Sequence, residues 1–238
     1  MKAILYAIYL QWKMDLRNKG VLITYYLVPL LFFVFIGNIF TSINPLVDET
    51  IIQTMVIFAI SMGAILGSPI PLVDFFSSEI KKSYMVSKIP LWHMLIINAV
   101  SAFIHLLIVS IIIVCLSPVL LGAFFPKNIL VLMIYVIVFI IANISIGTAL
   151  GLVVKSTTKL TMISQILFLP SIMLSGIMFP VSLLPDFLQK AGAVFPASWG
   201  FKYLQTNNFD FLIFLPFAAT LMVTSLIIFI SYKRVLRL

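Results

Sequence analysis

Six long stretches of the chain are apolar and contain no Asp, Glu, Lys or Arg. Each has about the ~20 residues or more that a helix needs to cross a hydrocarbon core roughly 30 Å thick. Backbone groups cannot hydrogen-bond to lipid, so apolar stretches of this length are predicted to be helices. The six predicted membrane spans are residues 21–40, 51–73, 91–117, 129–154, 160–179 and 211–231.

The first 19 residues are more polar than the spans. Apolar residues recur there at helical spacing, with Lys13 and Arg17 on another face. A secretion signal is not favoured, because Tyr6, Tyr9 and Gln11 interrupt the apolar run and no small-residue cleavage site follows. We therefore predict an amphipathic helix on the cytoplasmic membrane surface. Its apolar face holds Leu5, Ile8, Trp12 and Leu16.

The segment 180–210 is too long for a tight turn and too apolar for a solvated loop. Within it, Pro185 is predicted to begin a short helix and Pro196 to end it. We expect residues 180–200 to form a re-entrant extracellular cap or to lie in the outer leaflet, with protein around its ends. The predicted apolar face of this helix consists of Leu184, Phe187, Leu188, Ala191 and Phe195.

Composition supports the membrane assignment. The chain of 238 residues is 63% apolar and 9% charged, whereas a soluble domain is about half apolar and a quarter charged. Too few polar residues are present to cover a soluble core. The sequence thus predicts an all-α polytopic membrane protein with six transmembrane helices.

Basic residues are unevenly distributed between the predicted spans. Only Lys127, Lys190 and Lys202 fall on the outer side if the N-terminus is cytoplasmic, and four of the seven acids accompany them. The positive-inside rule therefore predicts that both termini are cytoplasmic. These outer acids are Asp48, Glu49, Asp186 and Asp210. The remaining twelve of the fifteen basic residues are Lys2, Lys13, Arg17, Lys19, Lys81, Lys82, Lys88, Lys155, Lys159, Lys233, Arg234 and Arg237.

The net charge of +8 is explained by the same rule, so no nucleic-acid partner is expected. Basic residues near the membrane surface instead predict contact with lipid headgroups. Cys115 is the one cysteine of the chain, which excludes an intrachain disulfide. No metal-binding motif is found, and no Gly is followed by Lys, so a phosphate-binding loop for ATP is absent.

Three motifs follow one another after the fifth predicted span: Leu-Ser-Gly-Ile-Met-Phe-Pro at 174–180, Leu-Pro-Asp-Phe-Leu-Gln at 184–189 and Phe-Pro-Ala-Ser-Trp-Gly at 195–200. Their order resembles the C-terminal signature of ABC-2 type transporter permeases. Taken singly, each residue also has a plainer interpretation as a site of close packing or a helix limit. The residues that define this extracellular cap motif are Gly176, Pro180, Pro185 and Pro196.

The resemblance implies one ABC-2 type transmembrane domain over residues 1–238, in the plasma membrane of a bacterium. It implies a pair formed with a second copy or a paralogue, and two cytosolic ATPase subunits that bind ATP and Mg. No cofactor is then expected in this chain. The transported compound would be amphipathic or lipophilic, such as a drug, an antimicrobial peptide or a lipid, and export follows from the resemblance alone.

The resemblance further implies a coupling helix in the cytoplasmic loop 77–92, which would contact the ATPase. The chain keeps an acidic residue near the start of this loop and Pro90 at its end, but lacks the Gly-Thr pair of many relatives. The residues predicted to serve coupling are Glu79, Lys81, Lys82, Tyr84, Met85 and Ile89.

The fifth predicted span is richer in polar residues than the fourth or sixth. In a paired exporter these side chains are candidates for the lining of a translocation path. The alternative is that they form interhelical hydrogen bonds, worth about 0.6 kcal/mol each. The candidate path residues are Ser164, Gln165, Ser171 and Ser175.

Two other functions compete with a permease. An ion-coupled secondary transporter usually needs an ionisable group within the membrane. Asn98, Ser101 and His105 share one helix face, so a polar path is conceivable, although a hydrogen bond from His105 to a neighbouring helix is favoured. A membrane-embedded enzyme is less favoured, because the acidic residues are scattered along the sequence.

Two small-residue patterns allow helices to approach closely. They are Gly-Ala-Ile-Leu-Gly at 63–67 and Gly-Thr-Ala-Leu-Gly at 147–151. We predict that they serve close packing inside one subunit.

Overall fold

The computed structural model describes residues 2–43, 50–125, 128–178, 180–204 and 211–236. Within these ranges every regular element is a helix, which confirms the predicted all-α class. The residues of the charge analysis that lie outside the described ranges are Asp48, Glu49, Lys127, Asp210 and Arg237.

The N-terminal segment forms α1 (Lys2–Arg17), as its helical spacing predicts. A continuous helix then follows, made of α2 (Lys19–Leu22), the π-helical turn η1 (Ile23–Leu27) and α3 (Val28–Ile43). Asn18 separates α1 from α2, and its side-chain oxygen accepts a hydrogen bond from the backbone N–H of Gly20 at 3.0 Å. This side chain caps the new helix and fixes the change of direction after α1.

The second span also contains a π-helical turn. It consists of α4 (Ile51–Met62), η3 (Gly63–Gly67) and α5 (Pro69–Ser77). Proline is accepted at the start of α5 because the first turn of a helix leaves its N–H groups unpaired. The short helix α6 (Ile80–Val86) follows.

The next two spans are long, uninterrupted helices. The helix α7 (Trp92–Leu121) ends at Gly122, whose φ of +66° is the left-handed conformation typical of a helix C-terminus. The helix α8 (Ile129–Val153) begins after Asn128, whose side chain accepts a hydrogen bond from the backbone N–H of Val131 at 3.3 Å.

Five helices of the described chain are long and apolar enough to cross a membrane. They cover five of the six predicted spans. The predicted span 160–179 corresponds to α9 (Thr157–Met173), which has 17 residues and is not among the five. It stops early because the chain turns at residues 174–176, where Gly176 has a φ of +91°. The structure thus confirms a multi-pass helical protein but not the count of six.

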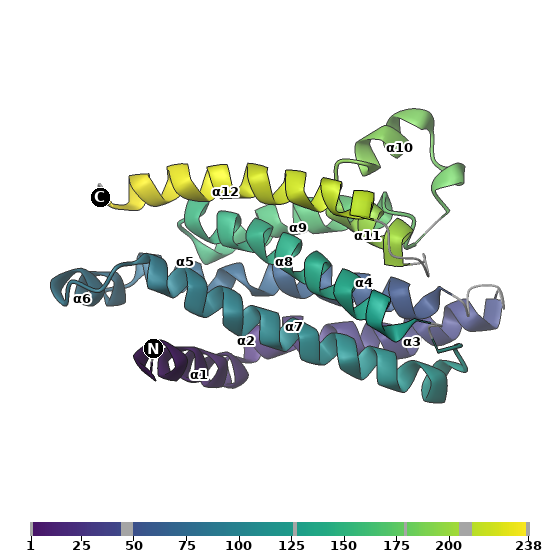
Figure 1. Cartoon of the computed structure of the whole chain (residues 1–238), viewed down its shortest axis with the longest axis horizontal. Helices are drawn as coiled ribbons and strands as arrows, with labels where there is room; N and C mark the ends of the chain where they lie inside the picture. Colours follow the sequence, from purple (N-terminus) through teal and green to yellow (C-terminus); the bar gives the residue numbers. More distant parts are fainter. Residues whose placement is uncertain (1, 44–49, 126–127, 179, 205–210, 237–238) are drawn as a thin grey trace.

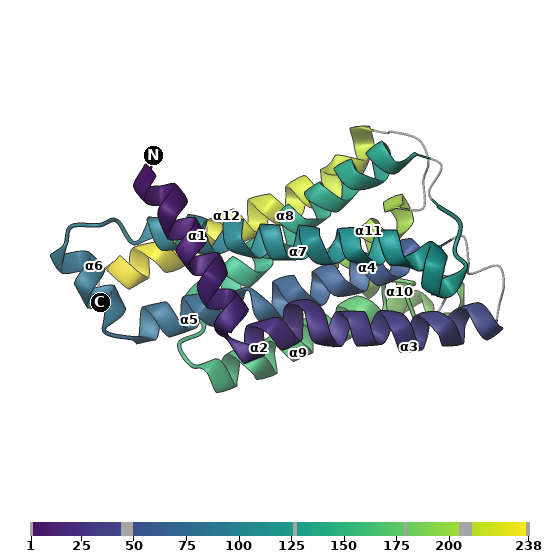
Figure 2. The ribbon, with the colours of Figure 1, turned by 90° about the horizontal axis from the view of Figure 1, so that it is seen from below.

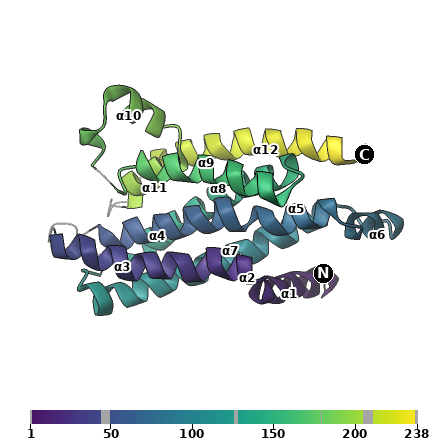
Figure 3. The same cartoon turned by 180° about the vertical axis from the view of Figure 1, so that it is seen from behind.

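The long helices run along one common axis (Figure 1). Both ends of the chain and α6 lie at one end of this bundle, whereas α10 (Asp186–Gly192) lies at the opposite end. Seen from below, α1 crosses the bundle obliquely instead of following its axis (Figure 2). The view from behind shows α3 running beside α4 (Figure 3).

The centre of the bundle is α4, because all twelve of its residues are buried. It contacts α3, α7, α8, α9 and α11 (Pro196–Leu204). The last helix, α12 (Phe214–Leu236), is preceded by the 3-10 turn η5 (Phe211–Ile213) and is the most exposed span. It packs mainly on α8 and leaves most of its apolar surface uncovered.

The small-residue pattern at 147–151 brings α8 against the second span, whereas the glycines of the pattern at 63–67 face Leu106 of α7 and Tyr25 of η1. A Cβ added at Gly147 would collide with the carbonyl oxygen of Ala64, and one at Gly151 would lie 2.8 Å from Cβ of Leu72. Only glycine allows such an approach of the backbones. The prediction that these patterns serve close packing inside one subunit is confirmed.

The segment after α9 contains more helices than predicted. The turn η4 (Val181–Leu183) precedes α10, which starts directly after Pro185 as expected. The predicted role of Pro196 is wrong in part, because this residue begins α11 instead of only ending the preceding helix, which stops at Gly192. Proline favours the first turn of a helix, where its missing N–H costs nothing. A re-entrant position of this segment is not confirmed.

Candidate functional site

The predicted coupling loop contains α6, which projects beyond the bundle at the end that holds both termini (Figure 1). None of its residues is buried. The turn that follows passes through Lys88, whose φ of 55° reverses the chain, and the backbone N–H of Ile89 donates to the carbonyl oxygen of Tyr84 at 2.9 Å. The loop is thus a closed, ordered unit at the surface.

Two contacts join α6 to the spans. The edge of the Tyr84 ring meets Phe75 of α5, with ring centroids 4.9 Å apart and an interplanar angle of 82°. Phe75 belongs to a buried cluster with Leu72 of α5 and Met94 of α7. In addition, Lys81 Nζ donates a hydrogen bond to the carbonyl oxygen of Val235 at 3.1 Å. A displacement of α6 therefore acts directly on α5 and α12, and on α7 through the cluster around Phe75.

The predicted coupling residues divide into two groups. Tyr84 and Lys81 contact the rest of the subunit, whereas Met85 and Ile89 are exposed. Glu79 and Lys82 form an exposed ion pair with each other at 2.9 Å. The most exposed apolar side chain of α6 is Val86, at 84%, which the sequence analysis did not select. The sequence did contain a signal for Val86, because an apolar residue in a charged cytoplasmic loop is a candidate for contact with a partner protein.

The four candidate path residues of α9 do not share one face. Ser164, Ser171 and Ser175 are buried inside the subunit, whereas Gln165 is exposed. The hydroxyl of Ser175 donates to the carbonyl oxygen of Ile172 at 2.8 Å, while the buried hydroxyl of Ser164 has no partner. The exposed face around Gln165 also holds Thr158 and Thr161 one to two turns earlier. Its exposed apolar residues are Met162, Ile163, Ile166, Leu169 and Met173.

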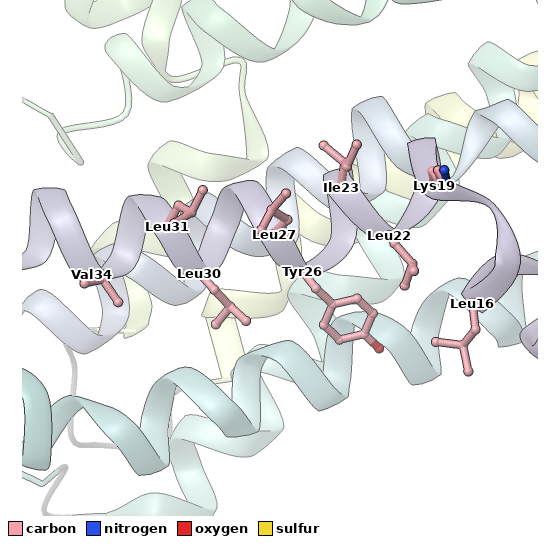
Figure 4. A pocket seen from close by; sticks show the side chains of 9 residues that line it. All are labelled: Leu16, Lys19, Leu22, Ile23, Tyr26, Leu27, Leu30, Leu31 and Val34. Carbon is pink, nitrogen blue, oxygen red and sulfur yellow. The ribbon is translucent and has the colours of Figure 1, made fainter.

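An open, apolar groove runs along the first span (Figure 4). Its volume is about 820 Å³. Lys19 lies at one end of it, and Leu22, Tyr26 and Leu30 point to the same side of the helix in Figure 4. The sequence analysis did not predict this groove. The residues that line it are Leu16, Lys19, Leu22, Ile23, Tyr26, Leu27, Leu30, Leu31 and Val34.

Gly176 of the cap motif occupies a position that only glycine fits. Besides its positive φ, a Cβ there would lie 2.9 Å from Cγ2 of Val181 and 3.1 Å from Cδ1 of Phe201. Pro185 and Pro196 mark the starts of α10 and α11, as described above, and Pro180 precedes η4. The motif therefore sets the turn between α9 and the helices that follow.

The polar face predicted on α7 forms hydrogen bonds to three other parts of the chain. Asn98 Nδ2 donates to the carbonyl oxygen of Ser68, between η3 and α5, at 2.9 Å. Ser101 Oγ donates to Asp15 of α1 at 2.6 Å. The His105 ring nitrogen Nδ1 lies 2.7 Å from the hydroxyl of Tyr26 in η1. The predicted hydrogen bond from His105 to a neighbouring helix is confirmed.

A metal site was also sought among the acidic, histidine and cysteine side chains. Among the residues that it describes, no three His, Cys, Asp or Glu side chains gather as metal ligands would. Together with the missing phosphate-binding loop, the arrangement offers a surface helix, apolar spans and an exposed apolar groove. Such features suit a subunit that passes a substrate through the membrane rather than one that hydrolyses nucleotides.

Comparison with known families agrees with this description. The family model described as ABC-2 type transporter matches residues 3–209. No curated protein matches the chain significantly. Because the match covers most of the 238 residues, the chain belongs to the ABC-2 type transporter family, as a membrane-spanning permease subunit without ATPase motifs of its own.

Proposed function

We propose that this chain is the permease of an ATP-driven exporter and that α6 receives the work of a cytosolic ATPase. The observation that carries the proposal is the connection of α6: none of its residues is buried, and yet Tyr84 and Lys81 tie it to α5 and α12. A movement of α6 caused by the ATPase can be transmitted to the membrane-spanning helices only through contacts of this kind. Two ATPase subunits would bind the ATP and Mg.

The orientation follows from the charges near α6. Both chain ends lie beside it (Figure 1), and the excess of basic residues supports a cytoplasmic position for this end of the bundle. The opposite end, with α10 and α11, is then extracellular. A cysteine placed at Lys81 should react with an impermeant reagent only after the cells are opened, and labelling on intact cells would reverse the topology.

The transported compound is proposed to be amphipathic or lipophilic. The support comes from the exposed surface, which is apolar along α3, α9 and α12. Drugs, antimicrobial peptides and lipids share this chemistry. We further propose that α9 and the turn at Gly176 complete a sixth span, with the segment 180–204 as an extracellular cap above it.

A pair of permease subunits is part of the proposal. Membership of the family supports a position of the fifth span near the interface of the pair. The exposed apolar face of α9 around Gln165 supports this assignment, since it has no cover within the subunit. The partner is a second copy of the chain or a paralogue.

The decisive experiment replaces residues 79–89 by a flexible Gly-Ser sequence. The expected result is a membrane-inserted permease that no longer co-purifies with its ATPase in mild detergent and no longer transports. As a matched control, a Gly-Ser replacement of residues 186–192 at the opposite end should leave ATPase binding intact. If partner binding and transport survive the first replacement, α6 is not the coupling element.

A further inference from the structure

A buried carboxylate fastens α1 to α7. Asp15 is 3% exposed. Its oxygen Oδ1 accepts a hydrogen bond from Gln11 Nε2 at 2.8 Å, and Oδ2 accepts one from Ser101 Oγ at 2.6 Å. A carboxylate removed from water is costly unless a cation compensates its charge. Within the described ranges, no Lys or Arg lies within ion-pair distance of Asp15.

The one described side chain near enough to Asp15 to compensate its charge, if protonated, is His105. Its Nε2 atom lies 3.8 Å from Asp15 Oδ2; the His105 side chain is fully buried and the Asp15 side chain is 4% exposed. This separation exceeds a hydrogen bond, so Nε2 has no partner. The other ring nitrogen, Nδ1, is occupied by the Tyr26 hydroxyl. One proton between Oδ2 and Nε2 would neutralise the pair and satisfy Nε2.

The ring of His105 is held rigidly in this position. The indole of Trp12 in α1 stacks on it with ring centroids 6.0 Å apart, and Tyr25 of η1 stacks on it at 5.1 Å. The two tyrosines that touch His105 are neighbours in the π-helical turn η1, and such turns are frequent at functional sites. Two helices and a π-turn thus converge on one imidazole.

A route for protons leads to Asp15 from the end of the bundle that holds α6. Asp15 lines a pocket of about 410 Å³ between α1, α5, α6 and α7. Its polar wall includes Asn18 and Asp74, and Tyr84 of α6 lines it as well. Because Asp15 lines this pocket, a proton from the pocket has no need to cross the apolar part of the bundle to bind its carboxyl group.

We propose that Asp15 and His105 together form a proton-binding site, in which one proton taken from the pocket is shared between Oδ2 and Nε2 and fastens α1 to α7. The loaded pair is neutral, either as a carboxylic acid with a neutral imidazole or as a carboxylate with an imidazolium. The empty pair is a carboxylate with a neutral imidazole, which carries one uncompensated negative charge. Release of the proton therefore loosens α1.

Other titratable groups around the pair do not replace its proton. Lys13 and Arg17 of α1 and Lys19 of α2 have exposed side chains. Asp74 of α5 faces the same pocket and adds a second acidic group to it. The remaining groups that line the site are the phenols of Tyr25, Tyr26 and Tyr84.

Burial raises the pKa of Asp15 above its usual value of 3.8, while the hydrogen bonds from Ser101 and Gln11 act in the opposite direction. Asp15 therefore binds its proton more tightly when α1 is packed on α7 (docked) than when α1 is detached from it (undocked). Docking is strongest at low pH, weakens as the pH rises from 3.8 to the raised pKa, and is constant above it. Within that window the docking equilibrium changes by up to about tenfold per pH unit, because one proton is linked to it.

The chain contains only two histidines, so His105 can be observed alone in a His93→Gln background. The full chain with nitrogen-15-labelled histidine is placed in lipid nanodiscs and titrated from about pH 4 to about pH 9. We expect the nitrogen-15 signal of His105 Nε2 to change with pH, because the shared proton either binds Nε2 or hydrogen-bonds to it. This change should disappear in Asp15→Asn, whose amide keeps the shape but carries no charge. Amide exchange of α1, corrected for its intrinsic pH dependence, should speed up by up to about tenfold per pH unit in the parent only.

Three results would overturn the proposal. One is a His105 signal that is constant over the whole titration in the parent protein. Another is a pH-dependent change of equal size in Asp15→Asn, which would mean that His105 titrates alone. The third is exchange of α1 that does not depend on pH. Since the titration of the parent protein is informative by itself, a variant that fails to fold leaves the test intact.

Discussion

Lys81 Nζ donates a hydrogen bond to the carbonyl oxygen of Val235, 154 residues further along the chain. This contact joins the coupling helix α6 to the last turn of α12. Its counterpart is the aromatic contact between Tyr84 and Phe75, which joins α6 to α5. Because Lys81 and Tyr84 lie on the same face of α6, the side chains on its other face remain available for a partner protein.

The first prediction concerns which side chains of α6 bind the ATPase. Met85→Ala should weaken co-purification of the ATPase by about fivefold or more, since apolar anchors dominate interface affinity. Lys82→Ala should have a smaller effect, because Lys82 is already paired with Glu79 in solvent and exposed pairs contribute little. Val194→Ala in the exposed chain after α10 is the control for loss of an exposed apolar side chain. A larger effect of Lys82→Ala would contradict this ranking.

The second prediction separates binding from coupling. Tyr84→Ala removes the contact with Phe75, a kind of contact worth about 0.5–1.5 kcal/mol, and should leave the ATPase bound while transport falls. Tyr84→Phe keeps the ring and should transport normally. Measurements of ATPase co-purification and of transport on the same preparations distinguish the two effects. Equal loss of binding and transport in Tyr84→Ala would assign Tyr84 to the docking surface instead.

The third prediction tests the pair of subunits. With Cys115 replaced by Ser, a cysteine at Gln165 should cross-link two copies in the membrane under mild oxidation, because this side chain is exposed on the uncovered face of α9. A cysteine at the neighbouring Ser164, which is 1% exposed, should not. Cross-linked dimer is read from a non-reducing gel. Absence of dimer at Gln165, with the protein still transporting, argues against α9 at a homodimer interface.

The fourth prediction concerns Gly176. Gly176→Ala should lower the unfolding temperature in detergent, because it combines a left-handed backbone, which costs about 1–3 kcal/mol, with the collision against Val181. Gly122→Ala has a similarly positive φ but open space around the added Cβ, so it measures the backbone strain alone. The two variants should therefore differ. If they lose equal stability, the close approach to Val181 is not what requires glycine at this turn.

The fifth prediction concerns Tyr26. Tyr26→Phe removes the hydroxyl that meets His105 Nδ1 and should destabilise the protein by about 1–3 kcal/mol, because a buried polar atom is left without a partner. Tyr9→Phe on the exposed side of α1 is the control. Thermal unfolding of both variants measures the difference. No loss in Tyr26→Phe would mean that the hydrogen bond contributes nothing to stability.

Much of the fold could be predicted because backbone N–H and C=O groups in lipid must be hydrogen-bonded within the protein. Long apolar stretches must be helices, and five of the six proposed spans appear as such. Helical spacing also identified the polar face of α7, whose three residues all hydrogen-bond to other elements. The sequence could not give the end of α9, because the turn depends on how Gly176 meets Phe201, a contact between distant segments.

The site was harder to predict than the fold. Polarity alone suggested that the serines of α9 line a path, yet three of the four candidates face the interior of the subunit. The sequence analysis did not single out Asp15 of the N-terminal helix. Its burial arises from the crossing of α1 over α7, and sequence spacing within α1 carries no information about that crossing.

The π-helical turns η1 and η3 have a consequence for how the first two spans are oriented. Each accommodates one extra residue within a turn, so the side chains that follow are rotated by about 100° from where a regular α-helix would point them. In the two halves of such a span, residues at different helical positions therefore face the same neighbouring helix. Deleting one residue from η3 would bring the halves into phase, and would turn α5, together with the attached α6, away from its present partners.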